Sequence, residues 1–257
     1  MSNISINVNG GTSGRDEDKI FVFVHGAWSA PYAWQTVKNY LLKTGHQVYL
    51  IQLPGHGQDA ADPKTLHMES YIKYVSDSIT AIGRNVILVG HSIAGMIISG
   101  VAEKIPDLIE KLVYVAAYVP VSGQSAYALS LLDQQSLLGA SLLVSEDQSQ
   151  FDIKRDDIIN IFCQDGAQGV QQLILDNYRS EPAAPSSDPV VLSKDRFGKV
   201  TKFYIQTLQD HGIGNVLQKE MIGGAAITNI YQVESGHFPS LSKPEELSDI
   251  FEQIAQK

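Results

Sequence analysis

The chain has 257 residues, of which 44% are hydrophobic and 18% are charged, so it is long enough and apolar enough to bury a sizeable core. This composition excludes a chain that is disordered throughout. The 19 basic and 28 acidic residues give a net charge of −9 without any basic run, which argues against nucleic acid or an anionic membrane as a partner. The single cysteine, Cys163, cannot form an internal disulfide, and its apolar neighbours predict a buried core residue.

The start of the chain has the composition of a polar tail. Residues 1–19 are rich in Asn, Gly and Ser and lack the apolar stretch of a secretory signal. Elsewhere no apolar run approaches the roughly 20 residues that cross a bilayer. We therefore expect a cytoplasmic protein whose N-terminal tail ends at residue 19.

From residue 20 onward, short apolar segments alternate with amphipathic ones. The apolar segments predict strands, and the amphipathic segments between them predict helices, among them 68–82 and 215–221. This alternation is typical of an α/β fold with a mostly parallel central sheet flanked by helices. The predicted strands are 20–24, 48–51, 85–89, 111–116, 202–206 and 226–232.

The alternation stops after Val119 and resumes near Val200. The intervening residues contain leucine-rich helical pieces and end in a proline-rich stretch, 181–189, which reads as a loop. A segment of this length is too long for a simple connection. We therefore predict one core, formed by 20–119 and 200–257, with residues 120–199 inserted as a helical cap, or lid.

A candidate nucleophile lies in the segment Gly90-His91-Ser92-Ile93-Ala94, between a predicted buried strand and a predicted helix. A serine on such a tight turn presents its hydroxyl at the carboxyl end of the sheet, and small residues two positions away on either side relieve the crowding. The strict pattern has glycine at the last position, where this chain has Ala94. The motif alone is a weak signal, and its place between strand and helix strengthens it.

A nucleophilic serine requires a base and an acid that orients the base. His237 follows the last predicted strand and is the best placed of the seven histidines, although a loop histidine often makes only a backbone hydrogen bond. Asp210 follows the strand at 202–206, where an aspartate can equally cap a helix. His211 and Glu234 are weaker rivals as base and acid. The chain order Ser92, Asp210, His237 matches that of hydrolases with this architecture.

Two backbone N–H groups are expected to stabilise the negative charge that develops on a substrate oxygen. Ile93 directly follows the candidate nucleophile, at the beginning of a predicted helix whose dipole favours negative charge. The second donor is expected from the turn His25-Gly26-Ala27-Trp28, with the N–H of Ala27 as the candidate. Gly26 permits the close approach of the backbone that this requires.

These segments resemble the α/β-hydrolase superfamily, and within it the branch of plant methylesterases, plant hydroxynitrile lyases and related bacterial esterases. The resemblance extends from Ile20 to the end of the chain and is loose over 120–199. It implies Ser92, Asp210 and His237 as a catalytic triad, with Ala27 and Ile93 as oxyanion donors. Three segments carry it: 21–28, 89–92, and 235–238 continuing into Leu241-Ser242-Lys243-Pro244-Glu245-Glu246-Leu247.

Two positions favour esterase over lyase within this branch. The resemblance implies that a lyase has threonine after the histidine of the first turn and lysine after the catalytic histidine. This chain has Gly26 and Phe238 there. We therefore predict a serine hydrolase that cleaves carboxylic esters through an acyl-enzyme, with a hydroxynitrile lyase or a slow-turnover small-molecule binding protein as the alternatives. Dehalogenases and epoxide hydrolases place an aspartate nucleophile where Ser92 stands.

The expected substrate is a small hydrophobic or aromatic ester, because the inserted segment is apolar. No nucleotide-binding or zinc-binding motif is present, so we expect no cofactor and no metal. The sequence leaves a monomer and a homodimer equally open. The expected pocket residues are Trp28, Leu131, Leu132, Leu138, Phe162 and Phe238.

Overall fold

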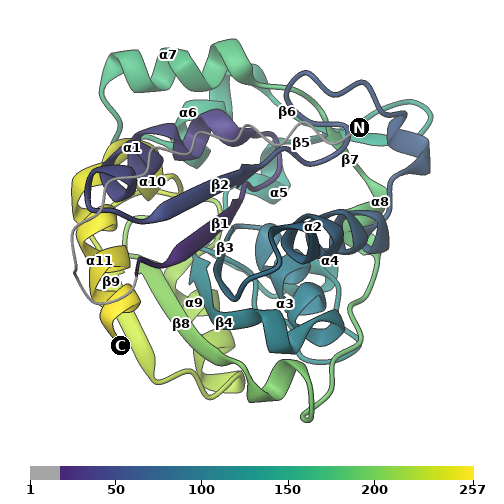
Figure 1. The fold of residues 1–257 in the computed structure, drawn as a ribbon. Helices are drawn as coiled ribbons and strands as arrows, with labels where there is room; N and C mark the ends of the chain where they lie inside the picture. Colours follow the sequence, from purple (N-terminus) through teal and green to yellow (C-terminus); the bar gives the residue numbers. More distant parts are fainter. Residues whose placement is uncertain (1–17) are drawn as a thin grey trace.

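The computed structural model describes residues 18–257, so the tail expected over 1–19 lies almost entirely outside the described residues. Its centre is a six-stranded sheet in the order β2-β1-β3-β4-β8-β9, and every neighbouring pair is parallel (Figure 1). The predicted α/β fold is confirmed. The strands are β1 (Ile20–Val24), β2 (Gln47–Ile51), β3 (Val86–His91), β4 (Ile109–Val115), β8 (Thr201–Thr207) and β9 (Asn229–Val233).

Strand β1 shows why the sheet is covered on both sides. Every residue of its sequence Ile-Phe-Val-Phe-Val is buried. Because side chains alternate along a strand, Phe21 and Phe23 enter one hydrophobic cluster whereas Val22 and Val24 enter another. A wholly apolar strand is typical of a parallel sheet between two layers of helices.

The helices form these two layers (Figure 1). Helices α1 (Gln35–Lys43) and α11 (Pro244–Gln256) pack against the face that carries Phe21 and Phe23. Helices α2 (Met68–Ile82), α3 (Ala94–Lys104) and α9 (Asn215–Gly224) cover the opposite face. The connections at the carboxyl ends of the strands remain outside these layers, and the candidate site residues lie there.

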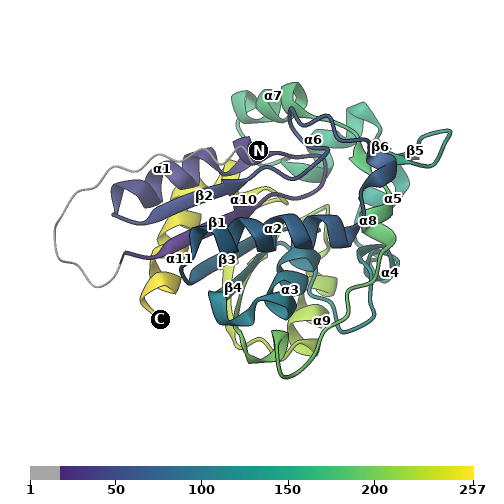
Figure 2. The same ribbon diagram turned by 45° about the vertical axis from the view of Figure 1, so that its right-hand side comes forward.

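Most of the segment 120–199 lies at one end of the sheet, and the chain after α8 runs along the molecule to the start of β8 (Figure 2). It contains helices, as expected, and also a small antiparallel sheet in the order β5-β6-β7, which the sequence did not predict. Ile161, Phe162 and Ile174 of this segment share a hydrophobic cluster with Phe238 and Leu241 of the core. Its elements are α4 (Ala126–Ser130), α5 (Leu138–Ser141), β5 (Leu142–Val144), β6 (Gln150–Ile153), α6 (Ile158–Phe162), α7 (Gln168–Asn177), β7 (Glu181–Pro182) and α8 (Ala184–Ser187); a short helix, α10 (Pro239–Ser242), precedes α11.

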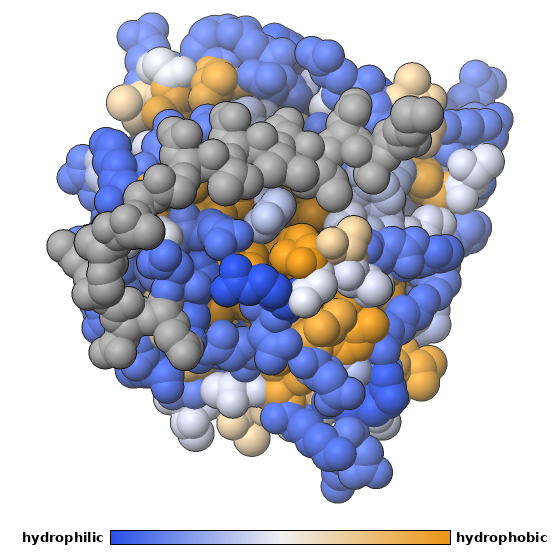
Figure 3. All heavy atoms as spheres, in the orientation of Figure 1, coloured by the Kyte–Doolittle hydropathy of each residue, from blue (hydrophilic) through white to orange (hydrophobic). Residues whose placement is uncertain are grey.

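The face shown in Figure 3 is mostly hydrophilic, with smaller hydrophobic areas between the polar side chains. Within residues 18–257, no helix is both long enough and apolar enough to cross a bilayer.

Candidate active site

Ser92 lies on the tight turn between β3 and α3. Its φ of 57° falls in the left-handed region, where a residue with a side chain is strained, and such strain is concentrated at functional sites. The turn leaves no room for larger neighbours: a Cβ on Gly90 would lie 2.8 Å from the carbonyl oxygen of Ala94. The small residues of the motif therefore follow from the backbone geometry that presents the hydroxyl of Ser92.

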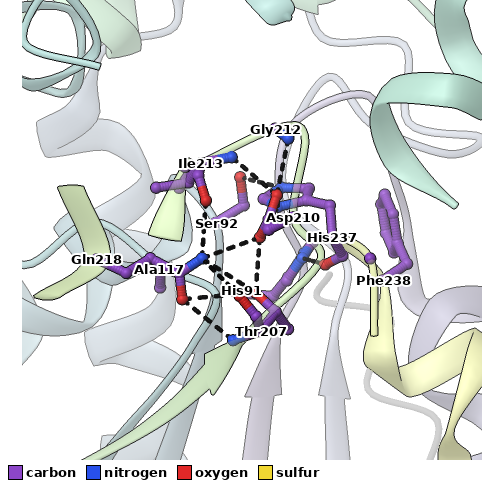
Figure 4. A network of polar contacts seen from close by, with 12 residues as sticks. His91, Ser92, Ala117, Thr207, Asp210, Gly212, Ile213, Gln218, His237 and Phe238 are labelled. Atoms are coloured by element: carbon purple, nitrogen blue, oxygen red, sulfur yellow. Dashed lines mark hydrogen bonds and ion pairs between the residues drawn. The ribbon is translucent and has the colours of Figure 1, made fainter. Parts of the chain in front are cut away.

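The structure brings Ser92 together with the predicted base and acid (Figure 4). Nε2 of His237 lies 3.0 Å from Oγ of Ser92. Nδ1 of the same ring lies 3.0 Å and 2.9 Å from the two carboxylate oxygens of Asp210. The three side chains follow β3, β8 and β9, whose carboxyl ends meet at one edge of the parallel sheet. This geometry allows a proton to move from the hydroxyl to the imidazole.

The carboxylate of Asp210 is buried in a set of donors. Oδ1 accepts the N–H groups of Gly212 and Ile213, and Oδ2 accepts the hydroxyl of Thr207 and the amide of Gln218 (Figure 4). Burial alone would raise the pKa of Asp210, but the charge and hydrogen bond of His237, together with the hydrogen bonds from Thr207 and Ile213, lower it below its ordinary value. Asp210 is therefore ionised at neutral pH and can hold the imidazole with its proton on Nδ1.

The two rivals considered from the sequence have other partners. Nδ1 of His211 lies 2.7 Å from the carbonyl of Asn160, and the carboxylate of Glu234 accepts a hydrogen bond from the exposed amide of Gln209. Neither side chain contacts Ser92 among the hydrogen bonds of the described residues. The geometry therefore favours His237 and Asp210 over both.

The N–H groups expected to hold a substrate oxygen lie at the same place. Ala27 and Ile93 both line the pocket that contains Ser92 and His237. Within residues 18–257 neither N–H has a hydrogen-bond acceptor in the protein, although most buried N–H groups do. Gly26 allows the turn to come this close, because a Cβ there would lie 2.8 Å from Nδ1 of His91 and 2.9 Å from Cβ of Ser92.

A pocket opens above Ser92, with a volume of about 570 Å³ that includes the part open to solvent. In the part of the chain that the structure describes, no Asp, Glu, Lys or Arg lines it. The polar residues of its lining are serines, tyrosines, Trp28 and His237. The lining residues are Ala27, Trp28, Ser92, Ile93, Tyr118, Ala126, Tyr127, Ser130, Leu138, Leu142, Phe151, Phe162, Ser186, Gly212, Ile213 and His237.

Three of the expected pocket residues lie in this wall, namely Trp28, Leu138 and Phe162, and three do not. Leu131 and Leu132 directly follow the end of α4 at Ser130 and are 67% and 59% exposed. Phe238 is only 3% exposed, but it packs into the cluster beneath the pocket, against the rings of His91 and Phe162. For these three residues the sequence prediction is corrected.

The structure also reveals a buried polar group that the sequence analysis missed. Glu181 was placed in a proline-rich loop, yet its side chain is buried and pairs with His56, which lies in a turn after β2. The carboxylate also accepts the backbone N–H of Trp28. The sequence around Glu181 does not indicate this burial, because its hydrogen-bond partners, Trp28 and His56, are more than 120 positions away in the chain.

The parallel sheet flanked by helices is the fold of α/β hydrolases, and a serine on a strained strand-to-helix turn, hydrogen-bonded to histidine, is typical of that class. Residues 21–250 match the family described as "Alpha/beta hydrolase family", and the chain belongs to this family.

Its relatives include esterases and methylesterases. The chain is 29% identical to "Putative methylesterase 13, chloroplastic" of Arabidopsis thaliana, over 93% of this chain and 57% of that protein. It therefore spans little more than half the length of that relative. It is 41% identical to "Carbendazim hydrolyzing esterase" of Nocardioides sp. (strain SG-4G), over 42% of this chain and 46% of that one. Polyneuridine aldehyde esterase has a similar fold, with a TM-score of 0.83, 19% identity and coverage of 93% and 100% of the two chains.

Proposed function

We propose that the protein is a cofactor-independent carboxylic ester hydrolase with Ser92 as nucleophile, His237 as base and Asp210 as the orienting acid. The observation that supports this most directly is the 3.0 Å approach of Nε2 of His237 to Oγ of Ser92, at the bottom of an apolar pocket. The esterases among its relatives point to the same reaction class.

In the first half of the reaction, Oγ of Ser92 attacks the carbonyl carbon of the ester while Nε2 of His237 takes the hydroxyl proton. The carbonyl oxygen becomes negatively charged and accepts hydrogen bonds from the N–H groups of Ala27 and Ile93. Each such donor lowers the barrier by about 3 kcal/mol. The carbon–oxygen bond to the alcohol then breaks, His237 returns its proton to the leaving alkoxide, and an acyl group remains on Ser92.

In the second half, a water molecule gives a proton to Nε2 of His237 and attacks the acyl carbon. The same two N–H groups stabilise the second oxyanion. The bond to Oγ of Ser92 breaks, His237 protonates that oxygen, and the free acid leaves. Throughout, Asp210 accepts the Nδ1–H of His237 and stabilises the imidazolium form.

The pocket wall favours small hydrophobic or aromatic esters. Trp28, Leu138, Phe151 and Phe162 supply apolar surface, and a charged acyl group would lose its hydration there without gaining a partner. We further propose that residues 120–199 form a cap over the site, since Leu138, Phe151 and Phe162 come from that segment.

Ester hydrolysis is preferred to cyanohydrin cleavage because of position 238. The resemblance places a lysine there in the lyases, which would face a departing cyanide ion. In this chain the position holds a buried phenylalanine whose ring lies against His91 and Phe162. We propose that the site therefore lacks the cation that a lyase uses.

The test is a panel of p-nitrophenyl esters on purified protein, with acyl chains of increasing length, a benzoyl group and a hemisuccinate. We expect turnover of the short aliphatic and benzoyl esters, weak turnover of the hemisuccinate, and loss of activity in Ser92→Ala. Cyanide release from mandelonitrile is measured in parallel. Hydrolysis retained by Ser92→Ala, or cyanide release without ester turnover, would contradict the proposal.

A further inference from the structure

The peptide group that carries the N–H of Ala27 is fixed from its carbonyl end. Nδ1 of His25 donates to the carbonyl of Gly26 at 2.9 Å, and Nε2 of the same ring accepts the N–H of Leu53 at 3.3 Å. These partners assign the proton to Nδ1. Since a trans peptide is planar, the carbonyl of Gly26 and the N–H of Ala27 point in opposite directions. Holding the carbonyl therefore aims the N–H.

The next peptide group is fixed by a residue far away in the chain. The N–H of Trp28 donates to Oε2 of Glu181 at 2.9 Å, and the indole N–H donates to the carbonyl of Phe151 at 3.1 Å. Trp28 has a φ of 53°, a conformation that costs energy for a residue with a side chain and needs support from its surroundings. Both supporting residues, Glu181 and Phe151, belong to the 120–199 segment.

Glu181 is 1% exposed and is held in turn by His56. Nε2 of His56 lies 2.7 Å from Oε2 of Glu181, and Nδ1 lies 3.0 Å from the carbonyl of Pro54. With an acceptor at each nitrogen, the ring suits the doubly protonated form. The rings of His25 and Tyr71 pack against it. Burying two charges is costly, and well-packed apolar residues often replace such pairs without loss of stability, so stability alone gives little reason for this pair.

We propose that Glu181 is a positioning residue for the oxyanion turn, holding the N–H of Trp28 so that the adjacent N–H of Ala27 stays aimed at the substrate oxygen. The inference rests on the proposed ester hydrolysis and adds to it. It makes the competence of the oxyanion site depend on how the 120–199 segment sits on the core. Trp28 lines the pocket whereas Glu181 does not, so we expect Glu181 to act through Trp28 and not through contact with substrate.

Two substitutions of Glu181 by side chains of similar length distinguish a positioning role from an effect of its charge. Glu181→Gln removes the charge but keeps an oxygen that can accept the N–H of Trp28, whereas Glu181→Met removes the acceptor as well. We expect Glu181→Met to lower kcat by about 10- to 100-fold with KM within about threefold of the wild type, since small misplacements of catalytic groups cost this much. Glu181→Gln should keep kcat within about fivefold.

Asp188→Asn is the matched control. Asp188 is also an acid of the 120–199 segment that accepts a core N–H, that of Met68 at 3.0 Å, but it lies outside the pocket lining and the oxyanion turn. We expect wild-type kcat from this variant. Urea unfolding of all four proteins shows whether changes in kcat follow changes in the free energy of unfolding.

A second readout reports on the oxyanion site directly. A trifluoromethyl ketone forms a charged hemiketal on Ser92, whereas the corresponding secondary alcohol binds without forming one. Glu181→Met should weaken binding of the ketone by the same 10- to 100-fold factor and leave binding of the alcohol unchanged. An unchanged kcat in Glu181→Met would overturn the proposal. So would equal losses of kcat in Glu181→Gln and Glu181→Met that parallel their losses in free energy of unfolding.

The two proposals can fail separately. If wild-type protein hydrolyses no ester of the panel, ester hydrolysis as the function is wrong. The rate at which a fluorophosphonate labels Ser92 still depends on the oxyanion donors and still compares Glu181→Met with wild type. Slower labelling by about tenfold or more would support the positioning role, and equal labelling would refute it.

Discussion

His91 and His237 are joined by a hydrogen bond of 2.7 Å from Nε2–H of His91 to the main-chain carbonyl of His237. The two rings also lie 4.6 Å apart between centroids. Burial, and then the neighbouring charge of His237, lower the pKa of His91 to about 3, so its ring is neutral and donates through one nitrogen. The residue before the proposed nucleophile thus fixes the loop of the proposed base.

Replacing His91 with leucine should therefore reduce both activity and stability. The buried carbonyl of His237 would lose its donor, which costs about 1–3 kcal/mol in free energy of unfolding, and kcat should fall about tenfold as the loop shifts. Urea unfolding and ester kinetics measure the two effects. His91→Gln is the control, because its amide can still donate, and it should lose less in both measurements. Equal losses in the two variants would show that the hydrogen bond is not the cause.

Asp210→Asn should lower kcat by about a thousandfold or more. The asparagine oxygen would stay on the N–H groups of Gly212 and Ile213, which turns its NH₂ toward Nδ1 of His237. The ring would then carry its proton on Nε2, facing Ser92, and could not accept the serine proton. Fluorophosphonate labelling of Ser92 should slow in parallel. Labelling at the wild-type rate would contradict the role of Asp210.

Gly26→Ala should damage the oxyanion turn. The new Cβ would lie 2.8–2.9 Å from atoms of His91 and Ser92, so the turn must move away from the nucleophile. We expect kcat to fall about 10- to 100-fold. Gly169→Ala, within α7, is the control: nothing lies within 4 Å of its Cβ, and alanine should stabilise the helix by about 0.5–1 kcal/mol without altering kcat. Wild-type kcat in Gly26→Ala would mean that the turn tolerates displacement.

The pair His56–Glu181 should give stability a dependence on pH. Burial lowers the pKa of His56, but the charge and hydrogen bond of Glu181 outweigh burial, and the net pKa is raised above 6.5 despite Arg179 nearby. The stabilisation is therefore complete below pH 6.5 and is lost as pH rises through the raised folded-state value. In Glu181→Gln burial dominates, so this slope should reverse. Urea unfolding from pH 5.5 to 9 measures it, and parallel curves for the two proteins would refute the assignment.

The sequence predicted the parts of this molecule that depend on local pattern. Ser92, Asp210 and His237 each follow a predicted strand, and the carboxyl ends of parallel strands lie on the same side of a sheet whatever lies between them. The pocket wall depends instead on how the 120–199 segment folds back, which is why Leu131 was placed there although it is exposed. The burial of Glu181 was not predicted because it depends on partners distant in the sequence. The small sheet was missed because β5, β6 and β7 have only two to four residues each, too few to show a periodic pattern.

Cys163 is the single cysteine of the chain, and its burial makes selective labelling of residues 120–199 possible. Cys163 is buried beside Phe162, and burial raises the pKa of its thiol to about 12, so it is neither accessible nor ionised at neutral pH. A thiol introduced at an exposed position such as Val191, which is 75% exposed, would therefore react alone with a maleimide dye. The wild-type chain thus serves directly as the scaffold for a fluorescent label on residues 120–199, without any cysteine having to be removed first.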